Sequence, residues 1–193
     1  MKEEVCKAIV LRSIPYVEKA KILTVFSEEK GILSVIIKNI TQQKCALASP
    51  FCELELVFYK KNSDMVNFKE GKILDDHIFL REKLEYLKTA SSMAKAILQS
   101  QMPGKQAPLL YRLLRAYLKQ IPSFSSHCSL LGSYYLKILQ HEGLFLEKHA
   151  FDEEESPWIR KLGEIQKFSD LKDQILPNSV LKKIERYFEE KLN

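Results

Sequence analysis

The chain is poor in glycine and has none of the common motifs for binding nucleotides or for hydrolysis. Its 193 residues include six glycines. Neither GxxxxGK[ST] nor GxGxxG occurs, so no loop is available to hold a triphosphate or a dinucleotide. GxSxG and HExxH are absent as well. The histidines are scattered, and each is better explained as a surface or loop residue than as a general base. These absences favour a binding protein over an enzyme and predict no cofactor.

The cysteines form no metal-binding pattern. They stand at four unrelated positions, Cys6, Cys45, Cys52 and Cys128. No CxxC pair and no zinc-finger spacing occurs, so reduced and mostly buried thiols are expected. Cys128, His141 and His149 could be proposed as ligands, but three residues at unrelated spacings make a weak set. We therefore expect no bound metal.

No apolar run approaches the roughly 18 residues of a membrane span. The N-terminal residues MKEEV carry acids and no apolar signal core. With 46% apolar and 28% charged residues, the composition is that of a globular protein. The length suffices for one domain or two modest ones. We expect a soluble, cytoplasmic protein.

Three runs rich in β-branched residues follow one another near the N-terminus, Val5–Leu11, Ile22–Phe26 and Ile32–Ile37. Each has the length of a strand. Ser13–Val17 contains a proline, which predicts a corner there. Glu28–Gly31 has the charged residues and the glycine of a short hairpin loop. The pattern predicts an antiparallel meander.

A second pair of strands is predicted at Glu53–Tyr59 and Met65–Ile73, with a polar turn at Lys60–Asp64. Polar and apolar residues alternate in the first of them, as in a strand with one buried face. Three strands, a gap, and two more strands is the order of a small five-stranded barrel of the oligonucleotide-binding (OB) type. This interpretation expects no parallel pairing.

Beyond Ile78 the apolar residues recur at steps of three and four, which predicts helices. The expected helices cover residues 80–101, 108–118, 130–141 and 169–176, and a last one is capped by Asn178-Ser179. Gly143 is expected as a C-cap. Asp152–Glu155 is expected to be a solvated linker, or else the acidic start of a helix with Pro157 in its first turn. The fold class is therefore α+β, with an OB barrel over residues 1–78 and an all-α helical domain over residues 79–193.

The positive charge is unevenly distributed. Residues 1–80 carry a net charge of +1, residues 81–149 carry +6 and residues 150–193 carry −2. A weakly charged barrel can still bind nucleic acid if its cations share one face. The barrel cations on strand ends or loops near the third strand are Arg12, Lys19, Lys21, Lys38 and Lys44.

Aromatic side chains beside such cations could stack on bases, and Tyr16, Phe51 and Tyr59 are candidates at turns or strand ends. Phe26 and Phe58 are expected in the core. The helices carry a second basic set, Lys88, Lys95, Lys105, Arg112, Arg115 and Lys119. These residues could extend a DNA path or bind an acidic partner peptide. Charge patterning leaves both uses open.

A family resemblance becomes visible in this order of segments. The opening K-A-I-V-L-R-S-x-P-Y-x-E, followed by I-L-T-V-F-S-x-E-x-G, resembles the start of RecO, a family of bacterial recombination mediators. Pro50-Phe51 with Glu53–Tyr59 is similar to the family's fourth strand, Tyr111–Leu118 to one of its helices, and Leu136–Gly143 to the end of its helical core. The resemblance spans most of residues 5–150 and implies an N-terminal OB barrel with a helical C-terminal domain.

The resemblance also implies a function. RecO proteins bind single- and double-stranded DNA and anneal complementary strands without ATP. They act with RecR to load RecA onto DNA coated by single-strand DNA-binding protein, whose acidic C-terminal tail they bind. A bacterial cytoplasmic protein associated with the nucleoid is implied.

Two segments depart from the family pattern. Many RecO proteins have a four-cysteine zinc motif after the stretch matching Leu136–Gly143, whereas this chain continues with Leu144–His149. The zinc motif is absent or degenerate. Family members often have a glycine followed by several arginines where this chain has Lys38–Lys44, which implies weaker DNA binding or binding carried more by the helices.

Charge and resemblance together predict a DNA-binding surface and no catalytic residue. The predicted contacts are Arg12, Tyr16, Lys19, Lys21, Lys38, Lys44, Arg112 and Arg115. Two alternatives share these features. One is an RNA-binding OB protein, and the other is a protein-interaction scaffold that does not bind nucleic acid directly.

Overall fold

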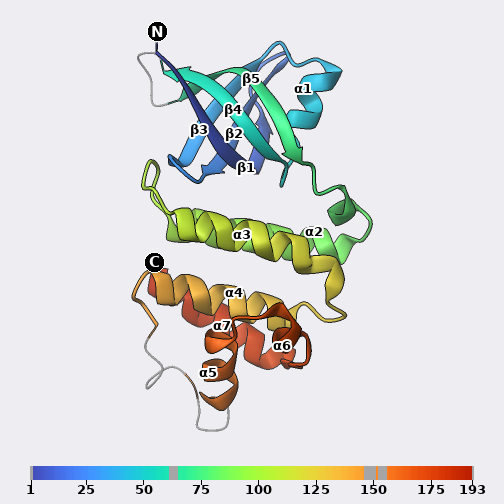
Figure 1. Cartoon of the computed structure of the whole chain (residues 1–193), viewed down its shortest axis with the longest axis vertical. Coiled ribbons are helices and arrows are strands. Elements are labelled where there is room, and N and C mark those ends of the chain that lie inside the picture. Colours follow the sequence, from blue (N-terminus) through green and yellow to red (C-terminus); the bar gives the residue numbers. More distant parts are fainter. Residues whose placement is uncertain (1, 61–64, 146–150, 152–155, 193) are drawn as a thin grey trace. The chain divides into compact units, whose positions relative to one another are not determined.

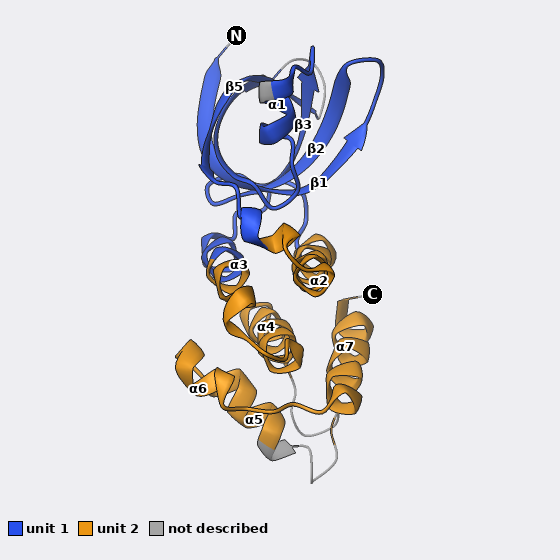
Figure 2. Ribbon diagram, turned by 90° about the vertical axis from the view of Figure 1, so that its right-hand side faces the viewer, with its two compact units in different colours: residues 1–79, 101–115 blue, residues 80–100, 116–193 orange. Residues whose placement is uncertain are grey.

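The structure is a computed structural model that describes residues 2–60, 65–145, 151 and 156–192. The chain forms two compact units (Figure 2): residues 1–79 with 101–115, and residues 80–100 with 116–193. The predicted division at residue 78 separates the strands from all the described helices except a short one at residues 42–47. The compact units do not follow it, because residues 101–115 belong with the strands. None of the described helices has both the length and the apolar composition to span a membrane.

The strands of the first unit form a closed barrel in the order β1-β2-β3-β5-β4 (Figure 1). Within the described residues they are β1 (Glu3–Pro15), β2 (Ala20–Ser27), β3 (Gly31–Lys38), β4 (Glu53–Lys60) and β5 (Val66–Asp75). The prediction of a five-stranded OB barrel followed by helices is confirmed. The polar turn expected at Lys60–Asp64 lies largely outside the described residues.

The expectation of wholly antiparallel pairing is wrong at one place. β3 and β5 run parallel, with Val35 opposite Val66 and Ile36 opposite Asn67. A closed ring with an odd number of strands cannot alternate direction all the way round, so at least one neighbouring pair must be parallel. The parallel contact is short, and the other four neighbouring pairs are antiparallel.

The barrel interior is filled by alternate side chains from all five strands. Leu23, Val25, Val35 and Ile37 are wholly buried there, and each contributes roughly 1.5–3 kcal/mol by leaving water. Phe58 lies in this core, as predicted. The branched and aromatic residues that indicated strands are thus also the residues that fill the barrel.

Two boundaries differ from the prediction. Ser13–Pro15 was expected as a corner but forms the end of β1, opposite Leu23, Ile22 and Lys21. A proline is tolerated there because a strand end needs fewer ladder hydrogen bonds. A helix, α1 (Gln42–Leu47), was not predicted between β3 and β4. Its six residues are too few for a helical period, although Thr41 caps it by accepting a hydrogen bond from the Lys44 N–H at 3.4 Å.

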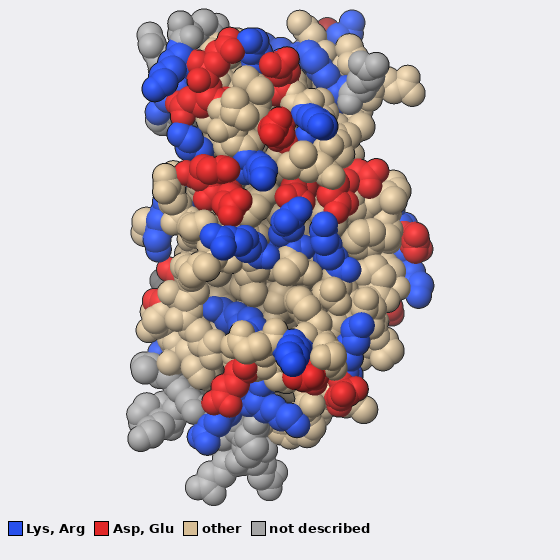
Figure 3. All heavy atoms as spheres, in the orientation of Figure 1, with Lys and Arg blue, Asp and Glu red and all other residues tan. Residues whose placement is uncertain are grey.

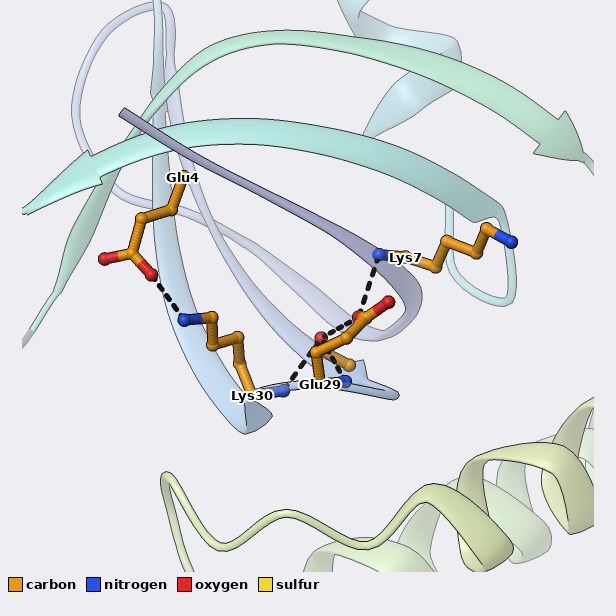
Figure 4. A network of polar contacts seen from close by, with 5 residues as sticks. Glu4, Lys7, Glu29 and Lys30 are labelled. Atoms are coloured by element: carbon orange, nitrogen blue, oxygen red, sulfur yellow. Dashed lines mark hydrogen bonds and ion pairs between the residues drawn. The ribbon is translucent and has the colours of Figure 1, made fainter. Parts of the chain in front are cut away.

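The β2–β3 hairpin loop is held by a network of polar contacts (Figure 4). The Ser27 hydroxyl accepts from the N–H groups of Glu29 (3.3 Å) and Lys30 (3.2 Å). The Glu29 carboxylate accepts from the Ser27 hydroxyl and from the Lys7 N–H, both at 3.2 Å. The Lys30 ammonium pairs with Glu4, and this hydrogen bond lowers the pKa of the Glu4 carboxyl. The loop predicted at Glu28–Gly31 is confirmed.

Residues 101–115 form part of the barrel unit. The Gly104 N–H donates to the Ile32 carbonyl at 3.1 Å, and Pro103 forms a parallel bridge with Ile32. Further along, the ring centroid of Tyr111 lies 6.1 Å from that of Phe26. The edge of β3 that β5 leaves open is thus partly covered by a segment that returns from far along the chain.

The second unit is helical. The described helices are α2 (Leu84–Ser100), α3 (Pro108–Gln120), α4 (Cys128–His141), α5 (Ser156–Glu164), α6 (Phe168–Lys172) and α7 (Asn178–Leu192), with 3-10 turns at Ile78–Arg81 and Ile121–Ser123. α3 begins in the first unit and ends in the second. α4 packs against α2, α5, α6 and α7 and is buried along most of its length.

The helices occur close to where the periodicity predicted them. Gly143 has φ +70°, and the Leu144 N–H donates to the Leu139 carbonyl at 2.8 Å, which is the Schellman termination expected at α4. α6 is shorter than the helix predicted over residues 169–176. The acidic run Asp152–Glu155 lies outside the described residues.

Candidate nucleic-acid interface

The register of β1, β2 and β3 determines which side chains point away from the barrel. Thr24 lies between Leu23 and Val25, which are wholly buried in the core, so Thr24 points outward. Thr24 is paired with Arg12 on β1 and with Ser34 on β3. Opposite residues in a ladder share a face, so these three side chains form one outward row.

Arg12 reaches this face because β1 contains a bulge. Ala8 and Val10 point into the core, and strict alternation would turn Arg12 inward as well. The register shifts between Val10 and Arg12, and the extra residue, Leu11, turns Arg12 outward. Bulges often redirect a side chain in this way at functional surfaces.

A row of isoleucines lies beside Arg12 on the same face. Ile14 is opposite Ile22, and Ile22 is opposite Ile36. Ile14 is 36% exposed, Ile22 is half-buried and Ile36 is buried. This row offers apolar surface to an unstacked base, next to a cation that could hold a phosphate.

The β1–β2 turn borders the open face. The Tyr16 N–H donates to the Ala20 carbonyl at 3.1 Å, and the Ala20 N–H donates to the Val17 carbonyl at 2.9 Å. Lys19 completes the turn with φ +57°. Tyr16 is 53% exposed, so its ring is available for stacking.

The predicted barrel lysines gather at the same end of the barrel. Lys38 is paired with Ala20, next to Lys19. The Lys19 carbonyl accepts from the Ile40 N–H at 2.8 Å, and the Lys44 ammonium donates to the Lys38 carbonyl at 3.3 Å. Lys44 is also 6.0 Å from the centroid of the Phe68 ring, so its ammonium already has partners in the fold. Lys21 is half-buried at this end, opposite Ile37.

Arg112 and Arg115 lie toward the other end of β2 from Lys21. The Arg112 guanidinium is 3.1 Å from the carboxylate of Glu28, just beyond the end of β2. Arg115 donates to Glu53 at 2.8 Å, and the Tyr111 hydroxyl donates to the same carboxylate at 3.1 Å. Glu53 is 1% exposed, so these donors offset the cost of burying its charge. Burial and the charge of Glu53 raise the pKa of Tyr111, and the hydrogen bond to Glu53 raises the pKa of Arg115.

The two arginines therefore do not continue the lysine group. Arg112 is 64% exposed and Arg115 is 47% exposed, so both can be reached from solvent. A phosphate at Arg115, however, would compete with a buried carboxylate. Arg12, Tyr16, Lys19 and Lys38 are the predicted contacts that the fold places on this face or at its border. Lys21 lies opposite the core residue Ile37 and therefore on the inward side of β2.

Some cations elsewhere on the barrel are paired with acids. Figure 3 shows basic and acidic side chains interspersed over the face of the barrel in view. Lys69 pairs with Glu3 at 2.7 Å, and Lys30 pairs with Glu4. The face in view therefore carries no broad basic surface. The open strand face around Arg12 marks the candidate interface.

One of the proposed stacking residues is not available. Phe51 is 6% exposed with φ +67°, and its N–H donates to the Val10 carbonyl at 2.7 Å, so its ring is part of the fold. Tyr59 is half-buried. Thr24 and Ser34 on the open face were not predicted, although the alternation in β2 indicates that Thr24 points outward.

The described residues contain no group of three or more His, Cys, Asp or Glu side chains placed to hold a metal ion. Cys6 and Cys52 are buried, Cys128 is half-buried and Cys45 is exposed. Burial raises the pKa of the Cys6 thiol, which keeps it protonated and unreactive. His77 follows β5 in a loop, as expected for the histidines, and it is wholly buried there.

Comparisons with known proteins agree with the barrel geometry. Residues 1–77 match the family model "Recombination protein O N terminal". A protein of Chlorobium phaeobacteroides called DNA repair protein RecO is 32% identical over 135 residues, which cover 67% of this chain and 51% of the relative. The RecO protein of Chlamydia trachomatis serovar D is 24% identical over 84% of this chain and 81% of its own length. The RecO protein of Syntrophomonas wolfei is 30% identical over 54% of this chain and 43% of its own length.

The match thus spans about half of the length of the Chlorobium relative and about four-fifths of the chlamydial one. Three observations indicate the same family: the order of the segments in the sequence, the closed five-stranded barrel and the match over residues 1–77. Residues 1–77 therefore belong to the RecO family, as its N-terminal domain.

Proposed function

We propose that this protein binds DNA in repair and recombination, and that it holds single-stranded DNA on the open outward face of β1, β2 and β3. The observation that supports this most is the composition of that face. Arg12 is turned outward by a bulge and stands beside a row of isoleucines in which Ile14 is exposed and Ile22 is half-buried. Lys19, Lys38 and the exposed Tyr16 border it.

The physical case has two parts. Cations at the rim neutralise phosphates and release counterions, which gives affinity without regard to sequence. The apolar row and the Tyr16 ring then receive bases, as in other proteins that bind single strands. A duplex offers the same phosphates, so weaker binding of double-stranded DNA is expected as well.

Strand annealing needs no nucleotide in this scheme. Pairing of complementary strands is downhill once their mutual repulsion is screened, and the chain lacks every common nucleotide-binding motif. We propose that the protein anneals complementary strands without ATP. Mixing two strands with donor and acceptor dyes should show faster pairing with the protein present, at the same rate with and without ATP.

Partners follow from the family membership, and they are proposals for this chain. We propose that it acts with RecR to load RecA onto DNA coated by single-strand DNA-binding protein, and that it binds the acidic tail of the latter. A pocket of about 310 Å³ in the helical unit, between α2, α4 and α7, supports the tail interaction. Lys95, Lys182 and Arg186 line it beside the apolar rings of Tyr135 and Phe188. An acidic peptide would have to displace Glu189, which pairs with Lys95 at 2.9 Å.

The test of the DNA face is a salt series of binding to labelled single-stranded DNA with the full chain. Replacing Arg12, Lys19 and Lys38 together with alanine should weaken binding to all sequences alike. The slope of log affinity against log salt should fall by about two units, because each phosphate contact on a single strand contributes about 0.7. Replacing Lys161, Lys167 and Lys183 of the helical unit changes the net charge equally and should change the slope little.

A triple variant that keeps both affinity and salt slope would rule out this face. Parent binding that does not respond to salt would favour the scaffold alternative, since phosphate contacts must release counterions. A matched RNA strand that binds more tightly than DNA would favour the RNA-binding alternative.

A further inference from the structure

Strand β5 has one edge that is largely uncovered by other strands among the described residues. β4 pairs with β5 from Val66 to Asp75, whereas β3 pairs only with Val66 and Asn67. The backbone of residues 68–74 therefore has a strand neighbour on one side only. An edge of this kind offers N–H and C=O groups to a strand from another molecule.

β5 and α1 lie beside each other (Figure 1). Residues of both line an open groove of about 550 Å³. Its apolar lining comes from Leu47 of α1 and from Phe68 and Ile73 of β5. Leu47 and Phe68 are half-buried, and Ile73 is 37% exposed. A strand added to β5 would cover this apolar surface as well as the open backbone.

The sequence of the edge is complementary to itself when read antiparallel about Gly71. Glu70 and Lys72 flank the glycine, and both are exposed. They lie opposite Val57 and Glu55 of β4 and so point outward from the barrel. If a second β5 runs antiparallel with the two Gly71 residues opposite each other, Glu70 faces the partner's Lys72. The symmetry axis repeats this pair, and opposite charges directly across a ladder stabilise it.

We infer that this edge of β5 is a self-association surface, on which two copies of the chain pair antiparallel about Gly71. The arrangement is isologous, as in most symmetric dimers. The two charge pairs lie outside the barrel, and Phe68 and Ile73 of both copies lie on the groove side. A contact along one short strand is small, so the dimer is in equilibrium with monomers and depends on concentration. The inference does not depend on the proposed DNA binding, because neither Glu70 nor Lys72 belongs to that face.

Sedimentation equilibrium of the full chain over a wide concentration range tests the inference. The parent should show a monomer–dimer equilibrium. Glu70→Lys and Lys72→Glu should each raise the dissociation constant at least tenfold, because each substitution places like charges opposite each other twice. A one-to-one mixture of the two variants should form a heterodimer with near-parental affinity, since both cross-strand pairs again join opposite charges.

Glu82→Lys and Lys88→Glu are the matched controls, because they make the same charge changes at exposed positions of the helical unit. Both should dimerise like the parent, and so should their mixture. Thermal unfolding checks that every variant is folded. A parent that stays monomeric, single variants that dimerise normally, controls that lose dimerisation, or a mixture that stays monomeric would each overturn the inference. The salt slope of DNA binding, measured on Glu70→Lys and Lys72→Glu, reports separately on the proposed function.

Discussion

The outward face of β1, β2 and β3 has two halves, one buried and the other open to solvent. Ile9 and Phe26 are wholly buried and Ile32 is 7% exposed, although all three point away from the barrel core. Arg12 is exposed on the same face, and Thr24 is half-buried. The strands alternate in the same way in both halves. The difference comes from residues 101–115, which contact Phe26 and Ile32 and leave the other half open.

This comparison shows what makes a strand face available for binding. Alternation in a sequence tells which side chains share a face, but a distant segment decides whether that face is covered. Coverage by residues 101–115 also decides which form of the protein is suited to binding measurements. A fragment ending near residue 80 would lack Tyr111 and Arg115, expose Phe26 and leave Glu53 without its donors. DNA binding is therefore best measured on the full chain.

The largest expected effect is at the centre of the covered half. Phe26→Ala should destabilise the protein by about 3–5 kcal/mol, the usual cost of removing a fully buried aromatic ring. Ile22→Ala lies on the same face of the same strand but in the open half, where Ile22 is only half-buried, and should cost about 1–2 kcal/mol. Urea unfolding of both variants measures the difference. Equal losses would mean that the two halves are not distinct.

The next effect is at the edge of β3, where the covering segment crosses Gly31. Gly31 has φ +68°, and a Cβ there would lie 2.0 Å from the Lys105 carbonyl oxygen. Gly31→Ala should therefore cost about 3 kcal/mol, from left-handed backbone strain and from displacement of the segment. Gly104→Ala is the control, because Gly104 has φ +76° with nothing within 4 Å of the added Cβ. It should cost only the strain, about 1–2 kcal/mol. Similar losses of stability in the two variants would show that residues 101–115 shift at little cost to make room for the added Cβ.

The two arginines at the rim of the covered half differ in role, because Arg115 is structural and Arg112 is more accessible. Arg115→Ala leaves the buried Glu53 carboxylate with Tyr111 as its remaining described donor and should cost about 2 kcal/mol. Arg112→Ala removes an ion pair whose arginine is 64% exposed, and should cost at most about 0.5 kcal/mol. Chemical unfolding gives both values. If Arg112→Ala also weakens DNA binding while stability is unchanged, Arg112 extends the DNA path. A stability loss in Arg112→Ala that equals the loss in Arg115→Ala would contradict the assignment.

Much of the barrel could be predicted because strand signals are local. Runs of β-branched residues, one alternating run and one hairpin glycine were enough to predict five strands and their order along the chain. The parallel β3–β5 contact follows from closing an odd ring, which no local pattern reports. The outward turn of Arg12 depends on a bulge at Leu11 that simple alternation does not contain.

The candidate site was predicted less completely for the same reason. The barrel lysines near the third strand could be grouped from their positions at strand ends and turns. The partners of Arg112 and Arg115 could not, since Glu28 and Glu53 are far away in the sequence and meet them only through the fold of residues 101–115. The burial of Phe51 also depends on a long-range hydrogen bond, from its N–H to Val10.

The smallest expected effect is at the β2–β3 loop, where the Lys30 ammonium pairs with Glu4 (Figure 4). The hydrogen bond from Lys30 lowers the pKa of Glu4 below its ordinary value of 4.5 and raises the pKa of Lys30 above 10.5. As pH falls, the unfolded chain therefore takes up the Glu4 proton first. The stabilisation is complete above about pH 4.5 and is lost as pH falls through the lower pKa of the folded state. At the other extreme, it is lost as pH rises through the raised pKa of Lys30.

Both side chains are 37% exposed, so solvent screening limits the effect to below about 1 kcal/mol. Glu4→Gln should thus be a few tenths of a kcal/mol less stable than the parent at pH 7, with the difference shrinking toward pH 3 and in high salt. Urea unfolding of both proteins at several pH values measures this difference. A difference that stays constant with pH would assign the loss to packing of the side chain, not to the ion pair.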